Sequence, residues 1–339
     1  MKEPGHCARF FVEADHLTYS TMLALVLDNG QLDLRSDHPV PIPGPGEALL
    51  QVRLAGICGT DMALIQGYKG GYSGVLGHEY VAEVIEAPGQ EQWLGRRVVG
   101  EINTTCGHCA HCRRGLVTHC QYRHVLGILN WDGAFAEYMN SPVELLHPVP
   151  EGLPDEMAVF TEPVAAAYAT LRDLPADAGN RIIIFGDGLL GQLIAAALVA
   201  EGYDPLLLGR HPSKLEVANT LGIRTTLAVP GDVEFDIAVD ATGRAEALST
   251  ILDCLRPRGT LILKTTAAHP GTLDLSRIVV NELHVIGSRC GPFPEALDAL
   301  SSGRLDPAPL ISATYPLAKA MKAFEYAAQS SVLKVLLYP

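Results

Sequence analysis

The pattern of apolar and polar positions changes near residue 163. Before it, short runs such as ALLQVRLAGI and YVAEVIEA alternate apolar with polar residues and are broken by Pro and Gly. This pattern predicts an irregular β region that starts at Met22. After it, apolar runs of strand length alternate with helical segments, as in RIIIFGDG followed by LLGQLIAAALVAEG. Strands that alternate with helices predict βαβ units and a parallel sheet.

The same rhythm continues along the chain. We expect further strands at DPLLLGR, FDIAVDATG, GTLILKTT and ELHVIGSR, and further helices at AAAYATLRDL, KLEVANTLG and EALSTILDCLRP. After Gly303, an apolar stretch and a predicted amphipathic helix, PLAKAMKAFEYAAQ, precede a last strand, KVLLYP. With 339 residues, 48% of them apolar, the chain is long enough for two domains with large cores.

Composition disfavours some classes of partner. The formal net charge is -13, so the surface as a whole repels phosphate backbones and anionic lipid. The chain has no run of eighteen apolar residues, and its first twenty positions lack the basic start and apolar middle of a signal peptide. We therefore expect a cytoplasmic protein that binds neither nucleic acid nor membranes. Residues 1–21 read as an extension before the first strand.

A glycine motif follows the strand RIIIF. GDGLLG, residues 186–191, lies between a strand and a helix of one βαβ unit, which is the context that a dinucleotide fingerprint requires. Gly186 permits the tight turn, Gly188 lets the backbone approach a pyrophosphate, and Gly191 lets the helix approach the strand. With Leu189 and Leu190 they are candidate cofactor contacts, because a helix N-terminus offers unpaired N–H groups to an anion. A glycine turn without a ligand is the alternative.

The end of the next strand bears on which dinucleotide binds. NAD-dependent enzymes normally place an acid there, which binds the ribose 2′-hydroxyl, whereas the segment LLLGRHPSK has Gly209. Arg210 follows, with His211 and Lys214 close by, and these donors suit a 2′-phosphate. The sequence therefore favours NADP, with NAD as the alternative. In that alternative Arg210 stacks on the adenine.

Four of the eight cysteines lie within fifteen positions. In CGHCAHCRRGLVTHC, the spacing of Cys106, Cys109, Cys112 and Cys120 is typical of four thiolates around one tetrahedral zinc, which leaves no position for a substrate. In a chain without a sign of export, such crowding indicates metal ligation more than disulfides. A disulfide-bonded or reduced loop stays open as an alternative, as does a zinc ribbon that contacts DNA.

A second, reactive zinc would need ligands from separate stretches and one open position. Cys58 in GICGTD, His78 in GHE and Glu162 in TEP each stand at the edge of an apolar run. Alone, each has an ordinary structural interpretation, since an isolated Cys is usually a buried apolar residue. Together, ahead of a nucleotide fold, they are candidate ligands.

These motifs resemble the zinc-dependent medium-chain dehydrogenase/reductase superfamily, which includes alcohol, polyol, threonine and glucose dehydrogenases. The similarity starts at Met22 and rests on GICGTD, GHEYVAEV, the four cysteines, DGAFAEYM, TEP, GDGLLG, DATG and KVLLYP. It implies a GroES-like β-barrel catalytic domain at 22–163, with a structural zinc lobe at about 103–122, completed by 304–339. It also implies a Rossmann doubly wound parallel sheet at 164–303, a cofactor in the cleft between the domains, and a homodimer or homotetramer.

The resemblance also implies roles for single residues. Cys58, His78 and Glu162 match the catalytic zinc ligands, and Glu79 matches an acid that ligates the metal or alternates with water. The four cysteines match the structural zinc lobe, so we expect two zinc ions per chain. Because a thiolate and one carboxylate already neutralise zinc, a second carboxylate would leave the site negative and reduce its Lewis acidity. We therefore expect Glu79 to give way to water or substrate during the reaction.

Thr60 resembles the family's hydroxyl relay, which passes the substrate proton toward the ribose; a hydroxyl in a local turn is the alternative. Many relatives carry a histidine five positions after the zinc cysteine, where this chain has Ala63. The proton would then leave through water or another group. This departure favours activity at alkaline pH.

Five further positions have two interpretations each. Asp61 is more typical of a structural partner than of a base. Thr242 in DATG resembles a residue near the nicotinamide, or it belongs to a turn at a strand end. Arg289 in GSRCG could touch phosphate, the nicotinamide amide or an anionic substrate, or form a surface salt bridge. Trp131 and Tyr138 either line the substrate pocket or belong to the core.

The sequence predicts an oxidoreductase that transfers a hydride between NADP(H) and a small alcohol, polyol or sugar, or the matching aldehyde or ketone. An NAD-dependent threonine-like or sugar dehydrogenase is the alternative among enzymes. A non-catalytic NADPH-binding or redox-sensing protein and a zinc-stabilised scaffold are the alternatives outside them. The candidate ligands Cys58, His78 and Glu162 argue against both, since a binding module needs no open metal site.

Overall fold

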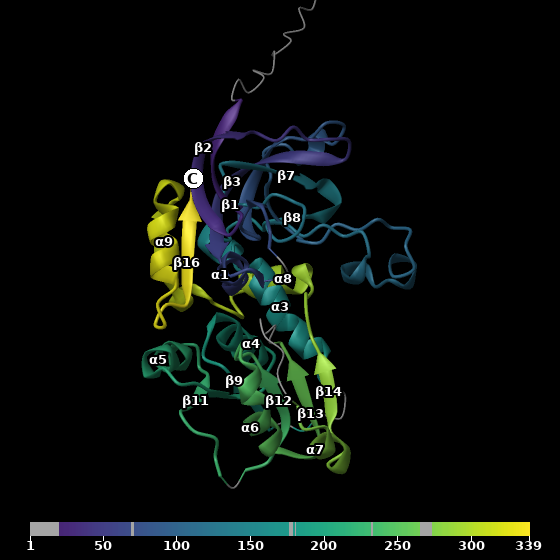
Figure 1. The fold of residues 1–339 in the computed structure, drawn as a ribbon, viewed down its shortest axis with the longest axis vertical. Helices are drawn as coiled ribbons and strands as arrows, with labels where there is room; N and C mark the ends of the chain where they lie inside the picture. Colours follow the sequence, from purple (N-terminus) through teal and green to yellow (C-terminus); the bar gives the residue numbers. More distant parts are fainter. Residues whose placement is uncertain (1–19, 69–70, 176–178, 180, 232, 265–272) are drawn as a thin grey trace, which may run out of the picture.

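The computed structural model describes residues 20–68, 71–175, 179, 181–231, 233–264 and 273–339. The N-terminal extension expected at 1–21 lies outside the described residues, except for Ser20 and Thr21. Figure 1 shows that the first part of the chain and its yellow C-terminal end form one group of strands, while the green middle part forms another.

A seven-stranded sheet dominates the first group, in the order β15-β16-β3-β5-β6-β8 with β7 paired to β3. Its strands are β3 (Glu47–Ile57), β5 (Glu79–Glu86), β6 (Arg97–Gly100), β7 (Tyr138–Pro142), β8 (Leu146–Pro148), β15 (Ile311–Pro316) and β16 (Lys334–Tyr338). β16 runs antiparallel to β3, with Leu336 opposite Gly56. The last residues of the chain are therefore bonded to one of its first strands.

A three-stranded sheet in the order β2-β1-β4 shares the core of this group. Its strands are β1 (Thr21–Asp28), β2 (Gln31–Pro39) and β4 (Gly74–Val75). Leu25 of β1 and Leu50 of β3 are fully buried in the same cluster. Helix α9 (Ala320–Ala327) adds Phe324, whose ring meets that of Phe135 edge to face with centroids 5.8 Å apart.

The second group is a six-stranded parallel sheet in the order β11-β10-β9-β12-β13-β14. Its strands are β9 (Ile182–Phe185), β10 (Leu206–Leu208), β11 (Arg224–Thr226), β12 (Phe235–Asp240), β13 (Leu255–Leu263) and β14 (His284–Gly287), and its helices are α3 (Thr161–Arg172), α4 (Leu189–Ala200), α5 (Pro212–Thr220), α6 (Leu248–Asp253), α7 (Leu275–Val280) and α8 (Phe293–Ser301). The strand order reverses at β9, so a crevice for a ligand is expected at the carboxyl ends of β9 and β12. This confirms the doubly wound parallel sheet that the βαβ rhythm predicts.

Several elements did not appear in the sequence pattern. Strand β11 has only three residues, RTT, and helix α7 has only six, so neither presents a full period of apolar positions. Helix α8 directly follows Gly291 and Pro292, two residues typical of loops, so the sequence gives no clear signal for its start. The segment AFAEYM alternates apolar and polar residues in part, but β7 begins only at Tyr138, and Phe135 O accepts the N–H of Leu25 at 2.8 Å.

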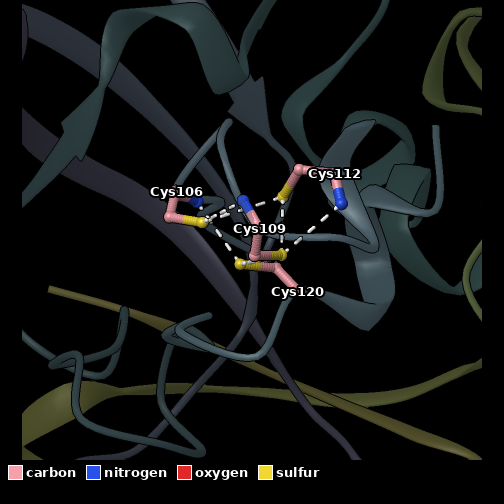
Figure 2. Close-up of side chains that lie close together, drawn as sticks. All are labelled: Cys106, Cys109, Cys112 and Cys120. Carbon is pink, nitrogen blue, oxygen red and sulfur yellow. Dashed lines mark hydrogen bonds between the residues drawn. The ribbon is translucent and has the colours of Figure 1, made fainter. Parts of the chain in front are cut away.

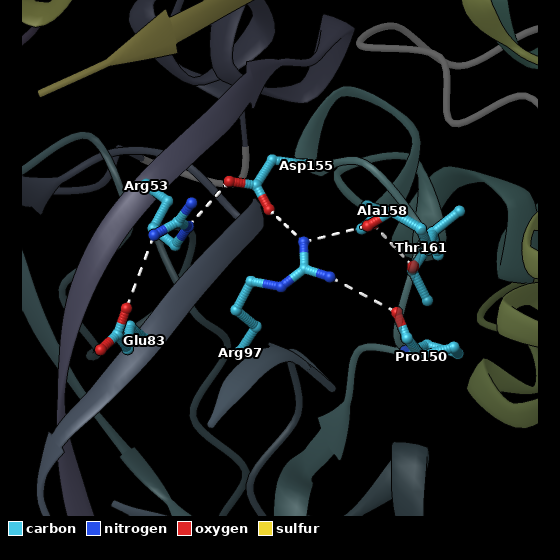
Figure 3. A network of polar contacts seen from close by, with 8 residues as sticks. Arg53, Glu83, Arg97, Pro150, Asp155, Ala158 and Thr161 are labelled. Carbon is cyan, nitrogen blue, oxygen red and sulfur yellow. Dashed lines mark hydrogen bonds and ion pairs between the residues drawn. The ribbon is translucent and has the colours of Figure 1, made fainter. Parts of the chain in front are cut away.

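A polar network attaches the start of α3 to the seven-stranded sheet (Figure 3). Asp155, the first residue of α2 (Asp155–Ala158), accepts from Arg97 Nη1 of β6 and from Arg53 Nε of β3, each at 2.7 Å. Arg97 also donates to Leu153 O at 2.9 Å. The hydroxyl of Thr161 then donates to Ala158 O at 2.7 Å, where α2 passes into α3. The network therefore sets the position of the next residue, Glu162.

Replacing Asp155 with Ala should lower the free energy of unfolding by about 1–3 kcal/mol, because two guanidinium groups lose a shared, partly buried acceptor. Urea denaturation monitored by fluorescence would measure the change. The control is Glu83→Ala, which removes only a 3.5 Å contact to the exposed side of Arg53 and should change stability by about 0.5 kcal/mol or less. Equal effects of the two substitutions would contradict the anchoring role.

Candidate active site

A glycine turn places His78 and Glu79 at the start of β5. Gly77 has φ of 97°, and a Cβ there would lie 2.6 Å from the ring of Phe135. From the other side, a Cβ on Gly133 would lie 2.2 Å from Gly77 O. Only glycine fits such a conformation and such contacts. The turn therefore holds His78, 3% exposed, in one place inside the protein.

Cys58 approaches from the start of α1 (Gly59–Ile65), where it is the N-cap residue. Its N–H donates to Asp61 Oδ2 at 2.8 Å, which fixes the first turn. Asp61 is fully buried, and its other oxygen lies 3.4 Å from His78 Nδ1. Its contacts are those of a structural partner, which is the role that the sequence favours. Thr60 Oγ1 lies 3.7 Å from Cys58 Sγ.

These segments converge on a set of possible metal ligands. One ligand atom each from Cys58, His78 and Glu79 lies within 4.8 Å of the others. Glu79 Oε1 is buried and has no hydrogen-bond partner among the described residues. A buried, unpartnered carboxylate oxygen is costly unless a cation or a donor satisfies it. A thiol, an imidazole and a carboxylate at this separation are a donor set that suits zinc.

The electrostatic environment of His78 also favours positive charge. Burial opposes protonation, but the carboxylate of Asp61 and the sulfur of Cys58 raise the pKa of His78 well above its usual value. An environment that draws a proton to the imidazole in this way also attracts a cation.

Lys334 is a member of the site that the sequence analysis did not identify. Its ammonium forms an ion pair with Glu79 Oε2, and both side chains are fully buried. It also donates to Ile57 O at 3.1 Å. A Cβ on Gly56 would lie 2.5 Å from Glu79 Oε2 and 3.0 Å from Lys334 Nζ, so Gly56 leaves the space for this pair. A lysine at the head of the apolar strand KVLLYP was the available signal.

The ion pair changes the charge balance expected at the site. Zinc surrounded by both carboxylates and the thiolate would carry one negative charge. Lys334 offsets the charge of Glu79, so adding this carboxylate to the ligands would not add net negative charge. Charge alone would then not require Glu79 to leave such an ion.

Glu162 stands apart from the compact set. It lies in the first turn of α3 and is partly buried, and its carboxylate is not among the three groups that lie within 4.8 Å of one another. Burial, together with the charge of Glu79, raises the pKa of Glu162 to about 7, while His78 and Lys334 oppose the shift. Glu162 is therefore near enough to interact electrostatically with the site.

A second lysine lies at the carboxyl end of β13. Lys264 is 8% exposed, and its ammonium donates to Ala166 O of α3 at 2.7 Å and to Ser288 Oγ at 3.1 Å. Burial lowers the pKa of Lys264 to about 8. The sequence analysis did not single it out, although a lysine that ends the apolar strand GTLILK is unusual. It connects the helix that carries Glu162 to the loop after β14.

That loop also contacts the cysteine lobe. Arg289 donates to Thr118 O, and Cys290 Sγ lies 3.7 Å from Asn103 Nδ2. A Cβ on Gly291 would lie 1.6 Å from Ala165 O, so the loop backbone rests on α3. In the structure Arg289 therefore contacts the lobe, a third possibility beside the ligand roles and the salt bridge considered from the sequence.

The four lobe cysteines form a compact group (Figure 2). Cys106 and Cys112 have sulfurs 3.9 Å apart, Cys109 and Cys112 3.5 Å, and Cys109 and Cys120 4.0 Å. Tetrahedral zinc with bonds of about 2.3 Å separates its sulfurs by about 3.8 Å. The donor set and its dimensions therefore fit a zinc ion with no open position.

Backbone N–H groups surround these sulfurs. The N–H of Cys106 and that of Tyr122 donate to Cys120 Sγ at 3.3 and 3.4 Å. Hydrogen bonds from the backbone of Cys112 and of Gln121 lower the pKa of Cys109 to about 5, and bonds from the backbone of Cys106 and Tyr122 lower that of Cys120. Burial and the adjacent sulfurs raise the pKa of Cys112 to about 12. The lobe thus favours the thiolate, the form that binds metal, at Cys109 and Cys120.

The glycines of GDGLLG have different surroundings. Gly186 has φ of 117°, and a Cβ there would lie 2.5 Å from Ala241 O. A Cβ on Gly191 would lie 1.9 Å from Gly186 O, whereas Gly188, the N-cap of α4, has open space around it. The first and last glycines therefore fit the tight turn and the close helix, and the middle one leaves the helix N-terminus open to an anion.

The donors expected at the end of β10 differ in exposure. Arg210 is exposed and His211 partly so, while Lys214 is only 9% exposed. Burial lowers the pKa of Lys214. The guanidinium of Arg210 makes no hydrogen bond or ion pair with any residue that the structure describes. Arg210 is therefore the most available cation at this strand end.

The remaining candidates have local partners. Thr242 Oγ1 donates to Asp240 Oδ1 at 2.8 Å within the turn after β12. Trp131 Nε1 donates to Asn140 O at 3.2 Å. Trp131 and Tyr138 both pack against the core of the first group of strands. These contacts match the structural alternatives considered for Thr242, Trp131 and Tyr138.

Two family models match this chain, one in each half. The model of the alcohol dehydrogenase GroES-like domain matches residues 44–151, and that of the zinc-binding dehydrogenase matches residues 190–302. An L-threonine 3-dehydrogenase from Mesorhizobium japonicum is 30% identical over 272 residues, covering 74% of this chain and 78% of that protein. A 2-dehydro-3-deoxy-L-galactonate 5-dehydrogenase from Pseudoalteromonas atlantica is 28% identical over 320 residues, covering 89% and 93%.

Solved structures show the same fold. A zinc-binding dehydrogenase from Sinorhizobium meliloti bound to NADP has a TM-score of 0.87 at 28% identity and covers 95% of this chain and 100% of its own. RspB from Escherichia coli, complexed with NADH, has a TM-score of 0.87 at 26% identity, with the same coverage.

The class of protein that fold and site define is a zinc-dependent oxidoreductase that acts on CH–OH groups with a nicotinamide cofactor. The chain belongs to the zinc-dependent medium-chain dehydrogenase/reductase family. The predicted family, the predicted fold class and the predicted enzyme class are all confirmed. Within the described residues, no helix has the length and apolar character that crossing a bilayer requires.

Replacing Lys334 with Met should lower the free energy of unfolding by about 3–5 kcal/mol, because Glu79 is then buried without its counter-charge. The double variant Lys334→Met/Glu79→Gln removes both charges and should recover more than half of that loss. Urea denaturation of chelated and zinc-loaded protein would measure both. If the double variant were less stable than Lys334→Met alone, charge compensation would not be the role of this pair.

Proposed function

We propose that the protein is an NADP-preferring, zinc-dependent alcohol dehydrogenase that acts on a small secondary alcohol, polyol or sugar, or on the matching carbonyl. The observation that carries the proposal is the group formed by half-buried Cys58 and buried His78 and Glu79, with its unpartnered carboxylate oxygen. Such an oxygen is costly to bury unless a cation or a donor satisfies it, and a zinc ion between these three side chains would do so.

In this proposal Cys58, His78 and Glu162 would hold a catalytic zinc, and Glu79 would be a fourth ligand that can give way to water or substrate. Zinc there supplies a Lewis acid, which stabilises an alkoxide or polarises a carbonyl. The ion pair with Lys334 gives Glu79 an alternative partner, so the carboxylate has a stable position when it is not a ligand. Burial of His78 and Asp61 keeps water from the back of the site.

The proton of the alcohol needs a path out of the site. Thr60, 3.7 Å from Cys58 Sγ, would accept it and pass it toward the ribose. With Ala63 in place of the usual histidine, the relay ends at water. Lys264 is close enough to Glu162 and Cys290 for their charges to affect its pKa, but nothing in its contacts requires it to carry the proton.

For the second metal, we propose a structural zinc bound by Cys106, Cys109, Cys112 and Cys120, and hence two zinc ions per chain. The tetrahedral sulfur separations support it. For the cofactor, we propose that the backbone from Gly186 to Gly191 binds the pyrophosphate and that Arg210, with His211 and Lys214, binds the 2′-phosphate. The absence of a side chain at Gly209 and the unpaired guanidinium of Arg210 in the described structure support it.

An NAD-dependent threonine-like or sugar dehydrogenase is the second candidate. The observation that favours it is the similarity to L-threonine 3-dehydrogenase, at 30% identity over 272 residues. The two candidates share the metal site and differ at the end of β10 and in the substrate pocket. A panel of hydroxy acids, amino alcohols, polyols and simple alcohols, each with both cofactors, would separate them.

Metal analysis of the purified protein should find two zinc ions per chain. Cys112→Ser should bind one zinc, and Cys58→Ser should lower kcat/KM on the order of 100-fold or more, because several kcal/mol of charge stabilisation are lost. Cys254→Ala is the control, since Cys254 lies in neither cluster, and it should keep both zinc ions. Full activity of Cys58→Ser would rule out the catalytic metal site.

Arg210→Ala should weaken NADPH binding by about 10–100-fold and leave NADH binding nearly unchanged, because only NADPH carries the charge that Arg210 meets. Fluorescence titration would measure both dissociation constants. Arg224→Ala removes another exposed arginine, at the start of β11, and should change neither. Unchanged NADPH affinity in Arg210→Ala would refute the phosphate role.

Hydride transfer should speed up from about pH 6 to pH 9, because the alcohol loses its proton without a histidine to complete the relay. Pre-steady-state kinetics with deuterated substrate would isolate this step. Ala63→His should flatten the profile and Thr60→Val should lower the rate, while Thr60→Ser should behave like the unchanged protein. A flat profile in the unchanged protein would count against unassisted proton loss.

A further inference from the structure

The second residue of the glycine motif, Asp187, reaches the end of the neighbouring strand. A Cβ built on Gly209 would lie 2.5 Å from Asp187 Cβ and 2.6 Å from Asp187 Oδ2. A side chain at 209 and the side chain of Asp187 therefore compete for one volume. Gly209 provides no carboxylate at the end of β10, but the carboxylate of Asp187, from the loop after β9, lies at this place instead.

This carboxylate is saturated by donors of the protein. Oδ2 accepts the N–H of Arg210 at 2.6 Å and that of His211 at 2.7 Å. His211 Nδ1 lies 3.0 Å from Oδ2 and 3.1 Å from Oδ1. Asp187 is 8% exposed, and although burial opposes its charge, the N–H groups of His211 and Arg210 lower its pKa. It is therefore an anion whose hydrogen-bonding capacity is largely used within the protein.

This arrangement turns the N–H groups of Arg210 and His211 toward Asp187 and leaves the side chain of Arg210 exposed. The two N–H groups after Gly209 are occupied by Asp187, so they are not free to bind a phosphate. The side chain of Arg210 remains exposed and unpaired in the described structure, and Lys214 lies one turn further along, close enough to Asp187 for the two charges to interact. A ligand at this strand end thus meets the guanidinium before it meets the amides.

We propose that Asp187 is a positioning residue that sets cofactor preference by holding the Arg210–His211 turn so that the guanidinium of Arg210 faces the 2′-phosphate. The inference rests on the proposed preference for NADP. A turn that is already ordered loses less entropy when it binds the phosphate. Because the adenosine of NADH has no 2′-phosphate, the benefit falls on NADPH. The opposite role, in which Asp187 itself accepts the ribose 2′-hydroxyl, would favour NADH.

The test compares dissociation constants of NADPH and NADH for the zinc-loaded full chain by fluorescence titration. Asp187→Ala should weaken NADPH binding about tenfold and NADH binding less than about threefold, because the loss is about that of one charge-assisted hydrogen bond between Arg210 and the phosphate. Asp187→Asn keeps an oxygen that accepts both N–H groups and should retain the original preference. A purely structural role would weaken both cofactors alike, so an unchanged ratio in Asp187→Ala overturns the inference.

Gly209→Ala gives an independent test. Its methyl group would meet Asp187 Cβ and Oδ2 and should displace this side chain, so it should reproduce the loss of preference. Stronger NADPH binding with weaker NADH binding in Asp187→Ala and Asp187→Asn would assign Asp187 to the ribose and overturn the inference. If the unchanged protein prefers NADH, the proposed NADP preference fails together with it. If it prefers NADPH and Asp187→Ala keeps that ratio, the inference alone fails.

Discussion

A buried ion pair between Glu79 and Lys334 connects the start of β5 to the start of β16. Neither of the two side chains is exposed to solvent. Neither charge is stable in the interior without the other. Their pairing requires the glycine at position 56 and joins positions that are 255 residues apart in the chain. The second oxygen of Glu79 is buried without a hydrogen-bond partner among the described residues, and one oxygen of this carboxylate lies within 4.8 Å of ligand atoms of Cys58 and His78. The ion pair therefore fixes the orientation of one candidate metal ligand.

Charged side chains also join distant segments elsewhere in the molecule. Asp155 joins two arginines of the sheet to the segment that leads into α3. Lys264 joins α3 to the loop after β14. Both contacts act on the helix that carries Glu162, so the position of that carboxylate depends on the seven-stranded sheet at one end and on the parallel sheet at the other. A substitution that shifts either sheet would therefore also shift Glu162.

The two candidate metal sites differ in how closely their ligands are grouped. The lobe has four sulfurs at separations close to those of a tetrahedral ion, with backbone N–H groups directed at them. The active-site group is compact in three members, while Glu162 lies outside the compact set. A closed set of ligands from one loop is placed by local spacing, but an open set from three elements depends on how those elements pack. Substrate exchange needs the second kind of site.

The sequence alone determined the local features: the alternating strands, the βαβ rhythm, the glycine turn before α4 and the spacing of the four cysteines. Periodicity and short-range spacing carry these, since they depend on neighbours along the chain. Only the tertiary structure decided which distant charges meet. A lysine at the end of an apolar strand marks Lys334 and Lys264 in the sequence, but no local pattern names their partners, Glu79 for the first and Ala166 and Ser288 for the second. The approach of Asp187 to position 209 has no local signal either. A buried charge is compatible with its strand only through a partner that folding brings from elsewhere.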